Sequence, residues 1–205
     1  NFLDCVDADN DGIFELFFAE HIYGSSDNNL LMVDLKDFTI SNEMLLIDND
    51  IAGHYNGNGK FFSADFDNDG FTEYQISLYN GIYSGKINAS KPNTPPAKAS
   101  KPTMVYDVNA GFIKLNWNAG VDNESSTCDL TYSIRIGSTP GADDIWYGDA
   151  NLDGRRLKLE QGNVGHQTYQ LVSTKNWQQG KYYIAVQTID ANGLGGPWSD
   201  ELVFD

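Results

Sequence analysis

Residues 7–15 read D-A-D-N-D-G-I-F-E, and residues 65–73 read D-F-D-N-D-G-F-T-E. The two segments begin 58 residues apart (7 to 65) and carry acids at positions one, three, five and nine. Asparagine stands at position four and glycine at position six in both copies. Agreement at so many positions indicates an internal repeat, and this repeat decides what fold the N-terminal part should have.

The repeated pattern predicts calcium sites. Four carboxylates within nine residues repel one another unless a cation lies among them. Calcium accepts six to eight oxygen ligands at flexible angles, whereas magnesium needs a strict octahedron and softer metals prefer sulfur or imidazole. We expect the glycine to permit the bend and the position-seven carbonyl to join the carboxylates. The predicted ligands of the two sites are Asp7, Asp9, Asp11, Ile13 and Glu15, and Asp65, Asp67, Asp69, Phe71 and Glu73.

The EF-hand is the obvious alternative, because its loop also begins D-x-D-x-D-G. An EF-hand closes with glutamate at position twelve and is flanked by helices. Here position twelve is Phe18 in the first copy and Ile76 in the second, and neither side chain can ligate. The residues after the first loop alternate in polarity as strands do. We therefore expect turns between two strands, with an acidic hairpin that holds no metal as the remaining alternative.

A nine-residue D-x-D-x-D-G-x-x-[DE] turn between strands, recurring at about sixty residues, resembles the FG-GAP and VCBS repeats of integrin-like β-propellers. The stretch G-K-F-F-S-A-D-F-D-N-D-G (residues 59–70) is similar to the strand and loop of that family, and A-G-H-Y-N-G-N-G (residues 52–59) is similar to the preceding turn. The resemblance covers residues 1–88 and implies about one and a half four-stranded blades with structural calcium. One blade cannot bury both faces. We expect either a fragment of a larger propeller or a small sheet that packs on a partner or on the second domain.

The acidity lies mostly in the N-terminal part of the chain. Residues 1–90 hold 16 acids against 3 lysines, whereas residues 91–205 hold 13 acids against 10 basic residues. Between them, residues 89–102 contain four prolines, which favour an extended connection. The predicted organisation is a repeat region at 1–88, a linker at 89–102 and a second domain at 103–205.

The second half alternates with period two and is broken by glycine-rich turns, which is typical of strands. Its segments F-I-K-L-N-W (112–117), L-T-Y-S-I-R-I-G (130–137) and Y-Y-I-A-V-Q-T-I-D (182–190) resemble a fibronectin type III domain, a seven-stranded immunoglobulin-like sandwich. The resemblance implies that Trp117 is the core tryptophan of the second strand and that Tyr182 forms the tyrosine corner. The fold class expected for the whole chain is therefore all-β, with partial propeller-like blades followed by a fibronectin type III sandwich.

The formal net charge of −16 makes nucleic acid and anionic membranes poor partners, because binding to phosphate requires clustered lysine and arginine. The sequence lacks a long apolar run, so we expect no insertion into a membrane. It also lacks the H-E-x-x-H and G-x-S-x-G patterns, and calcium already accounts for the paired carboxylates, so no enzymatic activity is expected. A third acidic stretch, at residues 149–157, ends in leucine and contains two arginines, and we predict no calcium there.

The expected function is a non-catalytic, calcium-stabilised adhesion or assembly module of a larger extracellular protein, secreted or attached to a bacterial surface. Its partner would be a protein or glycan at a cell surface or in a larger complex, or the remaining blades of its parent chain. Two alternatives stay open: accessory modules of a polysaccharide-degrading enzyme, and a structural subunit of a surface complex. Cys5 and Cys128 are too few for a disulfide framework, and we expect both to be unpaired and partly buried.

Overall fold

The computed structural model describes residues 2–21, 28–46, 60–67, 69–78, 81–86, 92–107, 109–158 and 160–205. The turn expected at residues 52–59 and the first residues of the expected linker, 89–91, lie outside this range. Every regular element in the described residues is a β-strand, which confirms the all-β fold class. Among these residues no helix has the length and apolar character needed to cross a membrane.

The chain divides into two compact units, Asn1–Asn93 and Thr94–Asp205. The division falls within the proline-rich stretch, but the second unit begins before the expected residue 103. Its early start has a physical basis, because Pro96 and Ala99 are buried and the amide of Ala97 donates a 2.9 Å hydrogen bond to the carbonyl of Val121. The later part of the proline-rich stretch thus packs as part of the second unit.

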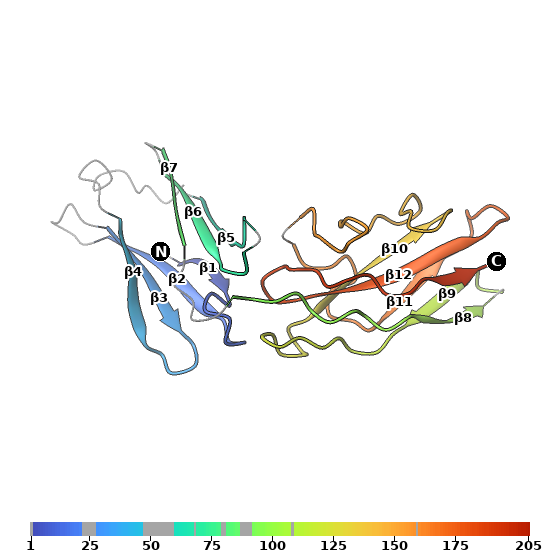
Figure 1. The fold of residues 1–205 in the computed structure, drawn as a ribbon, viewed down its shortest axis with the longest axis horizontal. Coiled ribbons are helices and arrows are strands. Elements are labelled where there is room, and N and C mark those ends of the chain that lie inside the picture. Colours follow the sequence, from blue (N-terminus) through green and yellow to red (C-terminus); the bar gives the residue numbers. More distant parts are fainter. Residues whose placement is uncertain are drawn as a thin grey trace. The chain divides into compact units, whose positions relative to one another are not determined.

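The first unit contains two antiparallel sheets, and each follows the order of its strands in the chain. The four strands of the first sheet, blue in Figure 1, are β1 (Phe2–Val6), β2 (Glu15–His21), β3 (Asn28–Asp34) and β4 (Ile40–Leu46). The three strands of the second sheet are β5 (Lys60–Ala64), β6 (Glu73–Leu78) and β7 (Gly81–Lys86). Each acidic loop joins the first two strands of its sheet, which confirms the strand flanks and excludes the helical flanks of an EF-hand.

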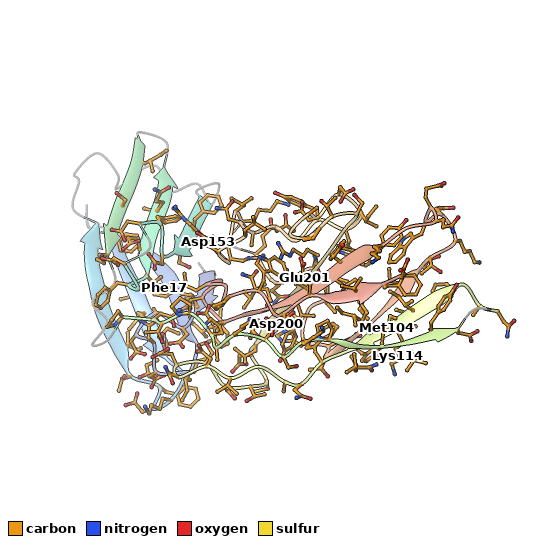
Figure 2. All side chains as sticks on the ribbon, turned by 45° about the vertical axis from the view of Figure 1, so that its right-hand side comes forward. Phe17, Met104, Lys114, Asp153, Asp200 and Glu201 are labelled. Carbon is orange, nitrogen blue, oxygen red and sulfur yellow. The ribbon has the colours of Figure 1, made fainter. Side chains whose placement is uncertain are left out.

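In the described part of the first unit, polar residues are buried as often as apolar ones. In its described part the buried apolar side chains are Val6, Ala8, Phe17, Tyr74 and Ile76. Phe17, labelled in Figure 2, is completely buried on β2, and Glu15 is buried on the same face of that strand. The buried polar residues are Asp7, Asn10, Glu15, Asp65, Thr72 and Asn93. Because most of these belong to the two acidic loops, the state of the loops should strongly influence the stability of this unit.

The second unit is a sandwich of two three-stranded antiparallel sheets. One sheet has the order β11-β9-β8 and the other the order β10-β12-β13. The strands are β8 (Thr103–Asp107), β9 (Phe112–Asn116), β10 (Thr131–Gly137), β11 (Tyr169–Ser173), β12 (Tyr182–Ile189) and β13 (Leu202–Phe204). The sheets enclose an apolar core to which β9 contributes Ile113 and Leu115, while Lys114, labelled in Figure 2, is exposed. This is a fibronectin type III-like β fold.

Two aromatic residues support this description of the second unit. Trp117, directly after β9, is 7% exposed and packs edge-on against Tyr132, with ring centroids 5.8 Å apart. Tyr182 begins β12, and its hydroxyl donates a 2.8 Å hydrogen bond to the carbonyl of Gln178. A hydroxyl bonded to the backbone a few residues upstream is the mark of a tyrosine corner. The described residues hold six of the seven expected strands, and an isolated bridge between Ile136 and Trp146 lies beside β10.

The prediction that both cysteines are partly buried is wrong. Cys5 on β1 and Cys128 in the loop before β10 are both exposed, and neither is part of a disulfide. The Sγ atom of Cys128 lies 3.1 Å from the hydroxyl of Ser126, within a polar turn that keeps the side chain at the surface.

Candidate metal centre

The described residues of the two acidic loops form equivalent hydrogen bonds between backbone amides and carboxylates. In the first loop, the amides of Asp11 and Gly12 donate to Asp7 Oδ1 and Oδ2 at 3.1 and 3.0 Å. In the second loop, the amides of Asp69 and Gly70 donate to the two oxygens of Asp65 at 3.0 and 2.8 Å. The position-one aspartate thus organises each loop by accepting from two amides, and the repeat seen in the sequence is also a structural repeat.

Further pairs of equivalent hydrogen bonds complete the repeat. The closing glutamate accepts from the amide of position two, at 2.6 Å from Ala8 to Glu15 Oε2 and at 2.8 Å from Phe66 to Glu73 Oε2. The glycine at position six has a φ angle of 88° in both loops, in the left-handed region that favours glycine. The expected role of Gly12 and Gly70 in the sharp bend is therefore met by their geometry.

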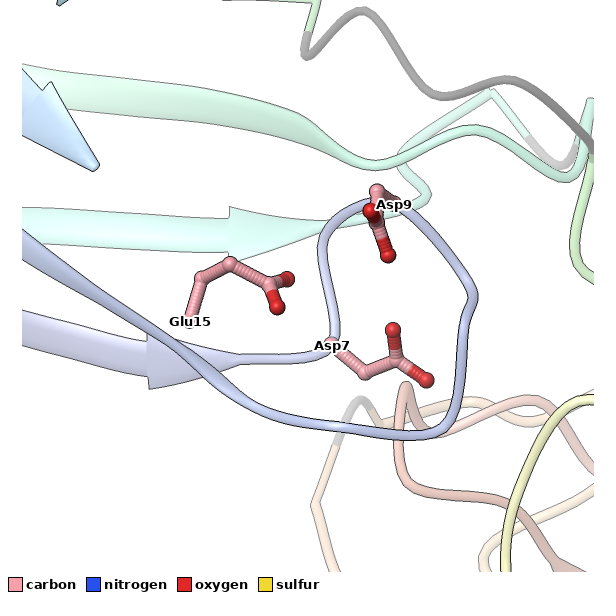
Figure 3. Close-up of side chains that lie close together, drawn as sticks. All are labelled: Asp7, Asp9 and Glu15. Atoms are coloured by element: carbon pink, nitrogen blue, oxygen red, sulfur yellow. The ribbon is translucent and has the colours of Figure 1, made fainter. Parts of the chain in front are cut away.

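The first loop brings three of its predicted ligands together. Asp7, Asp9 and Glu15 each offer a carboxylate oxygen within 4.8 Å of the other two. In Figure 3, Asp7 and Asp9 point into the loop and the carboxylate of Glu15 is directed toward it. Asp7 and Glu15 are each only 1% exposed. The Oε1 atom of Glu15 is buried and has no hydrogen-bond donor in the described part of the chain. A buried acceptor without a donor is costly, and a hard cation that prefers oxygen ligands would remove that cost.

The electrostatics of the first loop also favour the binding of a cation. Burial raises the pKa of Glu15 to about 8, and the nearby charges of Asp9 and Asp7 act in the same sense. Burial also raises the pKa of Asp7 to about 6, against the opposing effect of the amide hydrogen bonds from Gly12 and Asp11. Burial therefore disfavours the ionised forms of both carboxylates, and a divalent cation at this position would favour them.

The second loop forms a similar but more open group. Asp65, Asp67 and Glu73 each place an oxygen within 4.8 Å of the other two. Asp65 is buried, whereas Asp67 is exposed and Glu73 is half-buried. The Nζ atom of Lys86 lies 3.2 Å from Glu73 Oε1 and 3.9 Å from Asp67 Oδ2. A cationic side chain thus already faces this group.

The remaining predicted ligands take other partners. Asp11 Oδ2 forms a 2.6 Å ion pair with Lys36, and Asp69 Oδ2 forms a short ion pair with Lys86. The amide of Ile13 donates to Asp11 Oδ1 at 2.9 Å, and the amide of Phe71 donates to Asp69 Oδ1 at 3.0 Å. The position-five aspartates are thus engaged by lysines. Coordination by Asp11 and Asp69, and by the carbonyls of Ile13 and Phe71, stays a prediction.

The motif-based reasoning missed three charged residues near the loops, Asp34, Lys36 and Lys86. Asp34 is the cross-strand partner of Glu15, and Lys86 is the cross-strand partner of Glu73. Their spacing from the loops differs, because the turns after β2 and β6 differ in length. These residues could have been found from the sequence only if the strand register of both sheets had been known.

The third acidic stretch, at residues 149–157, does not assemble a group of acids in the described residues. Asp149 forms a 3.0 Å ion pair with Lys158, and Asp153 Oδ1 accepts from the amide of Arg155. The Arg156 side chain turns inward and donates to the Ser133 hydroxyl at 3.0 Å. These charged side chains are therefore bound to other groups of the second unit.

Comparisons with known proteins give a limited result. The chain matches no protein-family model. No curated protein matches it either. Among solved structures, an Fn3-like protein from Clostridium thermocellum is similar, with 18% identity, a TM-score of 0.37, and coverage of 55% of this chain and 94% of that one.

Proposed function

We propose that the chain is a calcium-stabilised, non-catalytic module of a larger secreted or cell-surface protein, where it serves adhesion or assembly. The observation that carries the proposal is the Oε1 atom of Glu15, which is buried without a hydrogen-bond donor and converges with Asp7 and Asp9. Oxygen-only ligands, two of them from deeply buried carboxylates, suit a hard cation of the size of calcium.

Calcium would act by crosslinking the ends of strands. Asp7 directly follows β1 and Glu15 begins β2, so one ion held by both would fix the bend between these strands. Few apolar residues are buried in the described part of the first unit, so this crosslink should contribute a large share of the stability of that unit. The residues that would hold the ion in the first loop are Asp7, Asp9 and Glu15, with Asp11 if it leaves Lys36.

A role in adhesion or assembly draws support from the organisation of the chain. A fibronectin type III-like sandwich follows the acidic unit, and sandwich domains of this type recur as connecting and presenting modules in surface proteins. The net charge of −16 favours cationic or neutral partners over polyanions. Binding to a glycan array would instead favour the role of accessory module in a polysaccharide-degrading protein.

Thermal unfolding of the full chain tests the calcium part of the proposal. At a calcium concentration of about 100 times Kd, binding to the folded state stabilises it by about 2.7 kcal/mol. For a unit of this size we expect Tm to rise by about 10 °C between excess EGTA and millimolar calcium. Magnesium at the same concentration should give a much smaller shift. An unchanged transition in EGTA would refute the proposal, and the Asp9→Asn variant provides the matched control with a weakened site.

A further inference from the structure

The two loops differ in the residue that the sheet places opposite the closing glutamate. In the first sheet, β3 places Asp34 across from Glu15. In the second sheet, β7 places Lys86 across from Glu73. Directly opposite residues of antiparallel strands share a face, where like charges repel and unlike charges attract. The closing glutamate of the first loop therefore faces an additional carboxylate, whereas the closing glutamate of the second loop faces an ammonium group.

Lys86 reaches most of the second loop. Its ammonium group forms a short ion pair with Asp69, lies 3.2 Å from Glu73 Oε1 and lies 3.9 Å from Asp67 Oδ2. It also lies 5.2 Å from the ring centroid of Phe71, which occupies position seven of the loop. One positive charge is thus within ion-pair distance of three of the four acids and is held from a fourth side by a cation–π contact.

The lysine of the first loop is placed differently. Lys36 lies in the turn between β3 and β4, and its ion pair is with Asp11, at 2.6 Å. The Oε1 atoms of Glu15 and Glu73 both lack a hydrogen-bond donor among the described residues, but Glu73 Oε1 lies 3.2 Å from the ammonium group of Lys86. Within the described residues no lysine forms an ion pair with Glu15, whereas Lys86 lies within ion-pair distance of the equivalent Glu73.

We infer that the two loops are not equivalent: the first takes calcium, while Lys86 is the built-in cation of the second, which binds calcium far more weakly. This inference rests on the proposed function, because it assumes that the first loop binds the ion. A calcium ion entering the second loop would have to displace an ammonium group from Asp69 and Glu73. Because β7 holds Lys86 opposite Glu73, the displaced charge would stay nearby and repel the ion.

Calcium titration of the full chain, followed by isothermal calorimetry with calcium chloride, tests the inference by counting sites. We expect one site per chain in the native protein. Asp9→Asn should abolish it, whereas the matched variant Asp67→Asn in the second loop should leave it unchanged. Lys86→Gln should add a second site, with calcium affinity at the second loop raised by roughly tenfold or more, which corresponds to about 1.4 kcal/mol.

Lys98→Gln is the control for the loss of one exposed lysine, because Lys98 forms a comparable surface ion pair, 2.6 Å from Asp200, in the second unit. It should leave the count at one. Two equivalent sites in the native chain, or loss of the site in Asp67→Asn, would overturn the inference and leave the proposed function intact. A native chain that binds no calcium would overturn both. All the variants change exposed or half-buried side chains, and circular dichroism would verify that each retains its β structure.

Discussion

The side-chain amide of Asn10 donates a 3.2 Å hydrogen bond to the carbonyl oxygen of Gly70, 60 residues further along the chain. Asn10 occupies position four of the first acidic loop, and Gly70 occupies position six of the second. The same carbonyl accepts a 2.5 Å hydrogen bond from the amide of Asn93 at the end of the first unit. The two loops are therefore joined directly, and a change in one should be felt by the other.

Replacement of Asn10 tests this link. Asn10→Ala removes the hydrogen bond to Gly70 and also places alanine at a φ of 62°, so we expect the free energy of unfolding to fall by about 2 kcal/mol. Asn10→Gly tolerates the backbone angle and should cost about 1 kcal/mol, the share of the side chain. Urea denaturation measures both. Equal stability of Asn10→Gly and the native chain would mean that the bond between the loops contributes nothing.

Gly70 should tolerate no side chain. Its φ is 88°, and an added Cβ would lie 2.7 Å from the carbonyl oxygen of Asn93 and 2.7 Å from Cβ of Pro92. We expect Gly70→Ala to lower the free energy of unfolding by roughly 2–4 kcal/mol, through backbone strain and the clash together. Gly165→Ala is the matched control, because Gly165 has a φ of 67° but open space around it. It should show only the strain, about 1 kcal/mol, and a similar loss at both positions would contradict the packing at Gly70.

The pH dependence of the calcium-free protein follows from Glu15. Its pKa rises from an ordinary value of 4.5 to about 8 in the folded chain, so between these values the folded state holds a proton that the unfolded state has lost. The contribution of Glu15 to the stability of the folded state is therefore fully present below about pH 4.5 and is lost as the pH rises through about 8. We expect Tm in the presence of a chelator to fall between about pH 6 and 8.

Glu15→Gln isolates this effect. The variant cannot ionise at position 15, so its Tm should depend less on pH over the same interval. Saturating calcium should also flatten the native profile, because the ion holds the carboxylate deprotonated. A calcium-free native chain whose stability increases toward pH 8 would contradict the burial of Glu15 as an uncompensated acid.

The tyrosine corner provides a prediction for the second unit that does not involve calcium. Tyr182→Phe removes the hydroxyl that donates to the carbonyl of Gln178 and leaves the ring stacked on Trp177, with centroids 4.2 Å apart. We expect a loss of about 1 kcal/mol in the free energy of unfolding of the sandwich, identical in calcium and in EGTA. A calcium-dependent loss would show that the two units do not unfold independently.

The sequence was sufficient for features that depend on local spacing. The acidic repeat predicted turns between strands, and period-two alternation predicted strands in the second half. In β9 this alternation corresponds to buried Ile113 and Leu115 on either side of exposed Lys114. The corner position of Tyr182 was implied by the resemblance to fibronectin type III domains, and its hydroxyl donates the corresponding hydrogen bond to the carbonyl of Gln178.

The rest depends on partners that spacing along the chain does not reveal. The pairing of Glu15 with Asp34 and of Glu73 with Lys86 is set by sheet register across turns of different length. Ala185 and Gln187 alternate with Ile184 and Val186 along β12, yet all four are buried, so both faces of this strand are covered there. The Gln187 side chain donates to the carbonyls of Gly154 and Gly196, in loops that cover this face. Such coverage follows only from the tertiary fold.

A crystal structure of the native chain grown in millimolar calcium would test the central claim most directly. We predict an anomalous peak in the first loop, with oxygens of Asp7, Asp9 and Glu15 at about 2.3–2.6 Å from the ion. A well-ordered first loop without such a peak, with Glu15 still buried beside Asp7 and Asp9, would contradict the assignment of calcium to this protein.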